Sequence, residues 1–163
     1  MTETQREFVP REDGGELDTA LAFLRFARHC VLKKTGGLEE DQLRRALVPS
    51  GTSLLGLVQH LAESERYWFG YHVAGHPDTD ITFGMDLPTG RDAATVVADY
   101  EAASAESDAI LTAIGDLETP VSRPIDDQLL SVRWVMAHMT GETARHAGHA
   151  DILREQLDGV TGR

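Results

Sequence analysis

The sequence predicts an all-α fold, a four-helix bundle with one long crossover connection. Three observations predict it: apolar residues recur at steps of three and four in four long segments, no strand-like alternation is found, and turn residues gather between the segments. Hydrophobic residues make up 41% of the chain, as in ordinary globular proteins. We therefore expect residues 1–163 to form a single domain around one core.

The first part of the chain predicts an arm, a long helix and a short helix. Residues 1–13 hold few apolar side chains and should form an extended arm before a bundle that spans residues 14–159. The apolar spacing of residues 16–34 predicts a first long helix, which a pair of glycines ends. Charges and spaced leucines predict a short helix within residues 38–46.

Two further long helices flank the crossover. A loop with capping residues precedes the second long helix, which we expect over residues 53–73. Residues 75–90 are rich in Pro, Gly and Asp and predict an irregular connection, and loops of this length often carry function. The Ala-rich residues 92–114 predict the third long helix, which Gly115 ends.

The fourth long helix, expected over residues 130–157, shows the clearest core-facing pattern. Its buried seam repeats at alternating steps of four and three, as in a heptad pattern. The seam comprises Val132, Met136, Met139, Thr143, His146, Ala150, Leu153 and Leu157. His146 should therefore point into the bundle. Glu142 lies one turn earlier and about 40° around the axis, so it reaches the same region, as His138 and His149 could.

This pair predicts a divalent-metal site. A carboxylate and an imidazole at i, i+4 on a core-facing surface bind metal in bundles, together with a ligand from a facing helix. His60 in the second helix, beside an apolar stripe that includes Trp68, can supply that ligand. Alternatively, the histidines are hydrogen-bonded packing residues and Glu142 pairs with Arg145 or Arg133.

Composition excludes several other classes of function. The formal charge is −12 and the pI about 4.9, so nucleic acid and anionic membrane surfaces would be repelled. No apolar run approaches the roughly 20 residues that span a bilayer. The acidic N-terminus does not resemble a signal peptide, which predicts a cytoplasmic protein. Cys30 is the single cysteine and should be a buried core residue.

Two segments resemble the DinB-like superfamily, in particular the actinobacterial branch grouped with mycothiol-dependent enzymes. They are LLGLVQHLAESERYW at residues 54–68 and ETARHAGHAD at residues 142–151, and the similarity extends over about residues 17–159. The resemblance implies a DinB/YfiT-like four-helix bundle, often a homodimer, that binds zinc or nickel through three side chains. Relatives of known activity transfer or isomerise small-molecule substrates with a low-molecular-weight thiol such as mycothiol or bacillithiol.

Carried onto this chain, the resemblance makes His60, Glu142 and His146 the metal ligands. Many relatives have His in place of Glu142, whereas the mycothiol-dependent maleylpyruvate isomerase type has Glu, which favours a thiol-dependent S-transferase or isomerase. Because a bound metal lowers the pKa of a thiol, it would activate the cosubstrate. The alternatives are a hydrolase that uses metal-activated water and a metal- or ligand-binding bundle without turnover.

Two further side chains are candidates for catalysis. Arg145 could hold a substrate carboxylate by a bidentate contact, as could Arg66, although both can equally form surface ion pairs. His149 lies three residues after His146 and about 60° around the axis, so it reaches the rim of the expected cavity. We expect it to act on the substrate side or to support His146.

Overall fold

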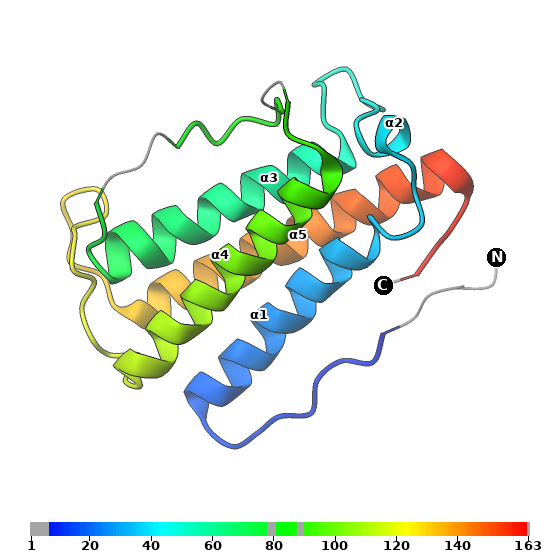
Figure 1. Cartoon of the computed structure of the whole chain (residues 1–163). Coiled ribbons are helices and arrows are strands. Elements are labelled where there is room, and N and C mark those ends of the chain that lie inside the picture. The colour runs from blue at the N-terminus through cyan, green and yellow to red at the C-terminus, as the bar shows by residue number, and fades with distance from the viewer. Residues whose placement is uncertain (1–6, 78–80, 88–89, 163) are drawn as a thin grey trace.

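The computed structural model describes residues 7–77, 81–87 and 90–162, and this part of the chain is helical apart from loops and two isolated β-bridges. Four long helical segments lie lengthwise beside one another (Figure 1). The helices are α1 (Glu16–Lys33), α2 (Glu40–Leu43), α3 (Leu54–Glu65), the π-helix η1 (Arg66–Val73), α4 (Ala93–Ile114) and α5 (Val132–Asp158). The predicted all-α class is confirmed.

The long helices form two pairs. α1 packs mainly on α5, α3 packs mainly on α4, and α3 also contacts α5. Figure 1 shows that α1 and α5 run in one direction and that α3 and α4 run in the other. Because α3 and α4 are parallel, the chain between them crosses the length of the molecule before α4 begins. This is the connection predicted over residues 75–90.

Local sequence determines where the helices begin and end. The side chains of Ser53, Asp92 and Ser131 each accept a hydrogen bond from a backbone N–H three residues later, which caps α3, α4 and α5. Gly115 and Gly159 adopt left-handed conformations and end α4 and α5. The predicted bounds of these helices are therefore nearly those observed.

The second long helix changes its hydrogen bonding at Arg66. The helix predicted over residues 53–73 is observed over residues 54–73, and its last part, residues 66–73, is a π-helix. π-Helices are rare and are frequent at functional sites. Apolar spacing does not reveal this change, because both helix types present a similar stripe over two turns. Four aromatic residues, Tyr67, Trp68, Phe69 and Tyr71, lie in this segment.

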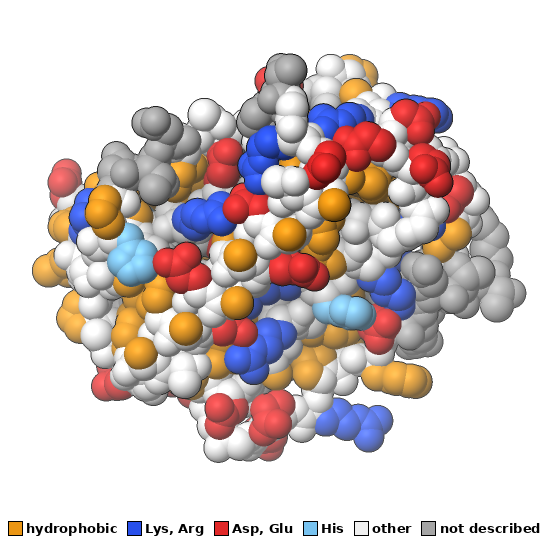
Figure 2. Space-filling model, in the orientation of Figure 1, with side chains coloured by type: hydrophobic (Ala, Val, Ile, Leu, Met, Phe, Trp, Pro, Cys, Tyr) orange, Lys and Arg blue, Asp and Glu red, His pale blue; other side chains and the backbone are white. Residues whose placement is uncertain are grey.

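The surface carries charges of both signs. Figure 2 shows basic and acidic side chains interspersed over the face formed by α1 and α4, with apolar side chains between them. A phosphate backbone would meet no continuous basic surface on this face. Among the described residues, none of the helices combines the length and the apolar character that crossing a membrane requires.

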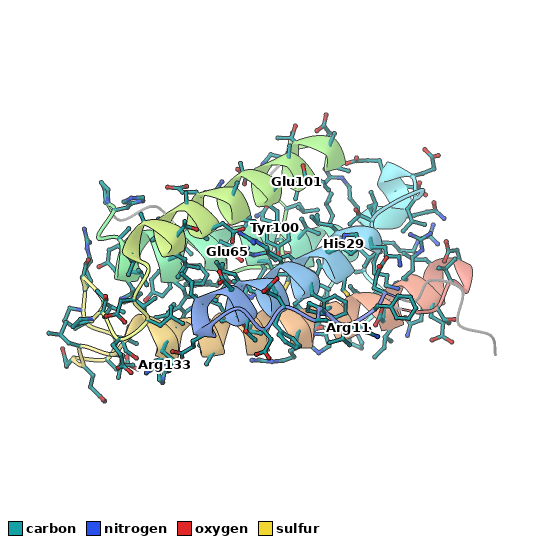
Figure 3. The ribbon with its side chains drawn as sticks, turned by 90° about the horizontal axis from the view of Figure 1, so that it is seen from below. Arg11, His29, Glu65, Tyr100, Glu101 and Arg133 are labelled. Atoms are coloured by element: carbon teal, nitrogen blue, oxygen red, sulfur yellow. The ribbon has the colours of Figure 1, made fainter. Side chains whose placement is uncertain are left out.

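A buried ion pair connects α1 and α3. The Nε and Nη2 atoms of Arg28 donate to the two carboxylate oxygens of Glu65 at 2.8 and 2.7 Å, and Nη1 donates to Asp108 of α4 at 2.7 Å. The side chains of Arg28 and Glu65 are 5% and 0% exposed. Figure 3 shows Glu65 and Tyr100 between the helices, whereas Arg133 lies at the edge of the molecule.

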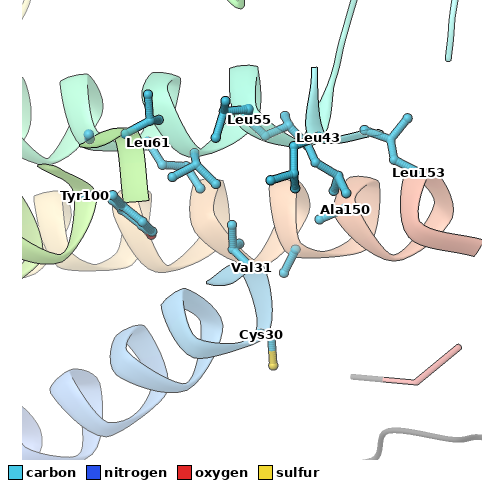
Figure 4. Close-up of a cluster of buried hydrophobic side chains, with 14 of the residues drawn as sticks. Cys30, Val31, Leu43, Leu55, Leu61, Tyr100, Ala150 and Leu153 are labelled. Atoms are coloured by element: carbon cyan, nitrogen blue, oxygen red, sulfur yellow. The ribbon is translucent and has the colours of Figure 1, made fainter. Parts of the chain in front are cut away.

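The apolar core fills the space between the helices. Figure 4 shows one of its two clusters, in which side chains of α3 meet residues of α1, α4 and α5. Cys30 is 4% exposed and belongs to this cluster, so its predicted burial is confirmed. Burial raises the pKa of the Cys30 thiol, which therefore stays protonated and unreactive at neutral pH.

Part of the predicted N-terminal arm is described. Residues 7–14 are not helical, and the carboxylate of Glu7 accepts a hydrogen bond from Lys33 at 2.7 Å near the end of α1. The arm is thus attached to α1 at this point. Residues 1–6 of the predicted arm lie outside the described residues.

Candidate metal centre

Three side chains from two helices meet between α3 and α5. His60 comes from α3, and Glu142 and His146 come from consecutive turns of α5. One ligand atom of each residue lies within 4.8 Å of the other two. The Oε1 atom of Glu142 is 2.9 Å from His146 Nε2 and 3.5 Å from His60 Nε2. The structure therefore brings together the three residues that the sequence analysis named as ligands.

The seam of α5 positions the two residues of this helix. Seven of its eight predicted members are buried, and the last, Leu157, is partly buried. His146 is 6% exposed because it occupies this seam, and Glu142 is half-buried beside it. α3 packs on α5 at this level and presents His60 from the opposite side. Helix periodicity alone thus accounts for the positions of Glu142 and His146.

A backbone carbonyl fixes the ring of His60. The Nδ1 atom lies 3.0 Å from the carbonyl oxygen of Phe83, which can only accept, so Nδ1 carries the proton. In the neutral ring Nε2 then carries the lone pair, and it lies 3.5 Å from Oε1 of Glu142. It is buried and has no hydrogen-bond partner among the described residues. A carbonyl on one ring nitrogen and a free lone pair on the other is the usual state of a metal-binding histidine.

The crossover is held against α3 so that this carbonyl stays in place. The Oε2 atom of Glu63 accepts hydrogen bonds from the backbone N–H of Phe83 at 2.8 Å and of Thr82 at 3.2 Å. Gln59 donates to the carbonyl of Asp86 at 3.3 Å. Residues 81–87 therefore lie beside the centre.

Gly56 permits this close approach of the crossover. A Cβ atom at this position would collide with the carbonyl oxygen of Met85. Gly56 lies one turn before His60 in α3 and is fully buried, so only a residue without a side chain allows the crossover to sit this close.

His149 supports the second histidine. Its Nδ1 atom lies 3.2 Å from Nδ1 of His146, and the side chain is otherwise exposed. One of the two nitrogens must donate and the other accept. The carboxylate of Glu142 lies 2.9 Å from Nε2 of His146 and can only accept, so Nε2 donates to it and Nδ1 of the neutral ring accepts from His149. His149 is not in the cluster of potential ligands.

The two arginines named as possible substrate contacts form ion pairs in this structure. Arg145 is 61% exposed and its Nη2 atom pairs with the Oε2 atom of Glu142. Arg66 donates to both carboxylate oxygens of Asp99, at 3.1 and 2.6 Å. Both arginines therefore form the ion pairs that were the alternative expectation for them. Arg145 therefore acts on Glu142, leaving Oε1 directed at the histidines.

Electrostatics favour the protonation states that bind a cation. Burial lowers the pKa of His146 and outweighs the opposing effect of Glu142, so the imidazole is neutral at pH 7. Burial tends to raise the pKa of Glu142, but His146, Arg145 and His60 together hold it below its ordinary value. A metal at Nε2 of His146 would displace the proton that this nitrogen donates to Glu142, and the carboxylate would then be free to bind the metal.

An aromatic hollow opens beside the centre. It has a volume of about 270 Å³ and is lined by His60, Ser64, Tyr67, Trp68, Phe83, His138 and Glu142. The sequence analysis placed Trp68 in an apolar stripe and did not identify this hollow. One signal could have indicated it. Tyr67 and Trp68 follow His60 by seven and eight residues, which is about two helical turns, so they return close to the helix face of His60.

His138 belongs to the aromatic wall and not to the ligand cluster. Its ring lies 4.4 Å from that of Trp68 and is stacked on Trp134 at 5.3 Å with an interplanar angle of 8°. Burial lowers its pKa, so it remains neutral at pH 7. His138 therefore contributes a flat uncharged ring to the hollow.

A second hollow lies next to His149. It has a volume of about 320 Å³, and its other walls are the loop before α3 and the C-terminal half of α5. The lining residues are Val48, Ser50, Thr52, His149, Ile152 and Leu153.

Comparison with known families gives one match. The model of a family described as mycothiol-S-transferase matches residues 19–159, which include both motif segments and all three candidate ligands. Comparison with curated proteins gives no match.

Proposed function

The chain belongs to the mycothiol S-transferase family, and from this membership we propose that it is a metal-dependent enzyme that joins a low-molecular-weight thiol to a small-molecule electrophile. The family is DinB-like, so the predicted resemblance is confirmed. Membership implies a thiol-related enzyme with a small-molecule substrate. The metal, its ligands and the use of mycothiol by this chain are our proposal.

We propose that His60, Glu142 and His146 hold a divalent metal, with zinc or nickel as the preferred ions. The observation that carries this assignment is the Nε2 atom of His60, which is buried and has no hydrogen-bond partner among the described residues, while Nδ1 is bonded to the Phe83 carbonyl. A cation between the three side chains would satisfy it. Two imidazole nitrogens and one carboxylate oxygen suit these metals and leave coordination positions open.

The protein's own groups keep this ligand set ready. The Phe83 carbonyl holds the His60 ring, His149 holds His146, and Arg145 holds the outer oxygen of Glu142. When bound, a divalent metal lowers the pKa of a coordinated thiol, so that the nucleophilic thiolate is available at neutral pH. Cys30 is buried and lies outside the ligand cluster, so the reacting thiol would come from the cosubstrate.

The remaining sequence-based expectations complete the proposal. We assign the observed helix packing to a single DinB/YfiT-like four-helix bundle over residues 14–159, with one long crossover. We also propose a cytoplasmic homodimer, on the basis of the family resemblance. Sedimentation of the purified protein tests the dimer directly.

The proposed function is tested by metal analysis and turnover on the same samples. Purified protein should contain about one divalent metal per chain and should conjugate mycothiol to an electrophile such as 1-chloro-2,4-dinitrobenzene. His146→Ala should lose metal and activity together. The control is His76→Ala, because His76 is exposed and pairs with Glu106 outside the centre.

The other outcomes identify the alternatives. Metal-dependent cleavage of an ester or amide without any thiol would show a hydrolase. One bound metal with neither activity would show a binding protein. Full activity in His146→Ala would overturn the metal centre itself.

A further inference from the structure

A buried histidine lies behind the aromatic hollow and takes no part in the candidate centre. His72, near the end of the π-helix η1, is 5% exposed, although histidine is not among the residues that are most often fully buried. It lines neither the aromatic hollow nor the hollow beside His149, and it is not in the cluster of potential ligands. The proposed metal centre therefore does not explain why a histidine is buried here.

Two reciprocal hydrogen bonds tie His72 to the loop before α5. Its Nδ1 atom lies 3.1 Å from the carbonyl oxygen of Arg123, which can only accept, so Nδ1 donates. In return, the backbone N–H of Arg123 donates to the carbonyl of His72 at 3.0 Å. The guanidinium carbon of Arg123 also lies 4.2 Å from the ring centroid of Tyr71. The ring of His72 is thus fixed from a point outside the hollow.

The ring of His72 packs against two walls of the hollow. It meets Tyr67 edge-on, with ring centroids 4.7 Å apart and an interplanar angle of 90°, and it stacks on Trp68 at 5.4 Å and 28°. Tyr67 and Trp68 both line the hollow, whereas His72 does not. Because rings in such contacts favour defined relative orientations, His72 can fix both walls from outside the hollow.

The π-helix brings these rings together. In an α-helix, residues five positions apart, such as Tyr67 and His72, would lie about 140° apart around the axis. Hydrogen bonds from i to i+5 widen the turn and bring such residues onto one face. The N–H of Ala74 donates to the carbonyl of Phe69 in this pattern. The change of helix type at Arg66 thus has a local consequence, which is the contact between His72 and Tyr67.

The second ring nitrogen of His72 gives no reason for a polar residue at this position. Nε2 is buried and has no hydrogen-bond partner among the described residues. A buried polar atom without a partner lowers the stability of the folded state. What His72 supplies is therefore a flat ring and one bond to Arg123. A phenyl ring, which has the same flat shape and no Nε2, should largely replace it.

We propose that His72 is a positioning residue for the substrate: its ring holds Tyr67 and Trp68 in the walls of the aromatic hollow. The proposal rests on the proposed function, because it takes the hollow beside the centre as the place of the small-molecule substrate. His72 lies outside both the hollow and the ligand cluster, so it acts through the two rings. Its loss should therefore raise KM and change kcat and metal content much less.

The position of the rings is tested without any ligand or turnover. The chain has two tryptophans, so Trp134→Phe leaves Trp68 alone, and acrylamide quenching of its fluorescence then measures its accessibility. In this background His72→Leu should raise the quenching constant, whereas His72→Phe should keep it near the parent value, because a flat ring is restored. The matched control is Val73→Ala, because Val73 is the next residue of η1, is 3% exposed and belongs to the apolar core. Quenching that is unchanged in His72→Leu, or raised equally in Val73→Ala, would overturn the proposal.

Steady-state kinetics test whether the substrate depends on these rings. With the metal-loaded enzyme, saturating mycothiol and 1-chloro-2,4-dinitrobenzene, His72→Leu should raise KM for the arene about two- to tenfold, the range of one aromatic contact. The kcat value and the bound metal should change little. His72→Phe should restore KM towards the wild-type value, and Val73→Ala should leave it near that value. An unchanged KM in His72→Leu, or no recovery in His72→Phe, would overturn the proposal.

The two measurements separate this inference from the proposed function. If the wild-type enzyme shows no thiol transfer, the proposed function fails, and the quenching of Trp68 alone decides the role of His72. If transfer occurs and KM does not depend on His72, only the inference fails. Circular dichroism shows whether His72→Leu folds. If it does not, His72→Asn takes its place, because its amide can still donate to the Arg123 carbonyl but it has no ring.

Discussion

The carbonyl oxygen of Phe83 lies 3.0 Å from Nδ1 of His60, and this bond links the crossover to the candidate centre. The two residues are 23 positions apart and belong to different structural elements. Through its backbone, Phe83 determines which ring nitrogen of His60 is available, and through its side chain it forms a wall of the aromatic hollow. The crossover therefore contacts a candidate metal ligand and also lines the aromatic hollow.

The first prediction orders the ligands. His60→Ala and His146→Ala should each remove most of the bound metal, and Glu142→Ala should weaken binding. Glu142→His should retain metal, because an imidazole can occupy the same i, i+4 position. His149→Ala should cost about 10–100-fold in affinity or activity, as loss of a group that orients a ligand does.

Metal content of the purified variants checks this order, with His29→Ala as control because His29 is exposed on α1 and paired with Glu7. The assignment is wrong if His149→Ala empties the site while Glu142→Ala leaves it full. The ligands would then be His60, His146 and His149.

The second prediction concerns pH. A metal-binding imidazole must be neutral, so occupancy should fall as pH drops through the imidazole range near 6.5. The folded state of the metal-free protein resists protonation of His146, because burial lowers its pKa, whereas the unfolded chain binds that proton at its ordinary pKa. Its unfolding free energy therefore decreases as pH falls below about 6.5.

Glu142 acts in the same direction at lower pH. Its pKa is held below the ordinary value in the folded state, so its contribution to stability is present above that value and is lost as pH falls through the folded pKa. Metal content after dialysis between about pH 7.5 and 5, together with urea titrations of the metal-free protein, measures both effects. Flat occupancy over this range would argue against two histidine ligands.

The sequence predicted the helices well because their positions depend on local patterns. The seam of α5 and the caps at Ser53, Asp92 and Ser131 are visible in the sequence, and they place Glu142 and His146 on one face. The position of His60 opposite this pair depends on packing between α3 and α5. Its choice as the facing ligand rested on the stripe around it and on the motif resemblance.

Other features depend on contacts between distant residues. The bond from His60 to Phe83 and the burial of Arg28 against Glu65 each join residues more than 20 positions apart. No periodicity records such pairs, and a charged residue is ordinarily expected at the surface. The π-helix is likewise invisible to spacing. The aromatic hollow is lined by residues of α3, the π-helix, the crossover and α5. Because it depends on contacts between these distant segments, the sequence did not indicate it.

The third prediction concerns metal removal. The metal-free protein should remain folded, because a chain of this size has a sufficient apolar core, unlike small zinc modules. The core clusters include residues of all the long helices and do not involve the three candidate ligands. Far-UV circular dichroism before and after a chelator should be nearly the same. Loss of most helical signal would show that the metal has a structural role.

The fourth prediction concerns the buried ion pair. Glu65→Gln removes the fully buried carboxylate that pairs with Arg28, leaves Asp108 as the acidic partner of Arg28, and should destabilise the protein by up to about 3–5 kcal/mol. The double variant Arg28→Met with Glu65→Leu should be less destabilised than Glu65→Gln, because neither charge stays unpaired. Urea unfolding of the variants measures the free energies. A double variant that is the least stable would mean that the pair itself holds α1 to α3.

The last prediction uses Gly56 to separate the crossover from the metal ligands. Gly56→Ala changes no ligand, but its Cβ atom would meet the Met85 carbonyl, so the crossover must move away from α3. The Phe83 carbonyl would then lose its hold on His60, and we expect metal affinity to fall about 10–100-fold, as for other groups that orient a ligand. Calorimetric titration with zinc measures this loss. Gly148→Ala is the matched control, since Gly148 lies in α5 with no atom within 4 Å of an added Cβ. That change should leave zinc affinity intact and stabilise the helix by up to about 1 kcal/mol. Equal zinc affinity in both variants would show that His60 is oriented without the crossover.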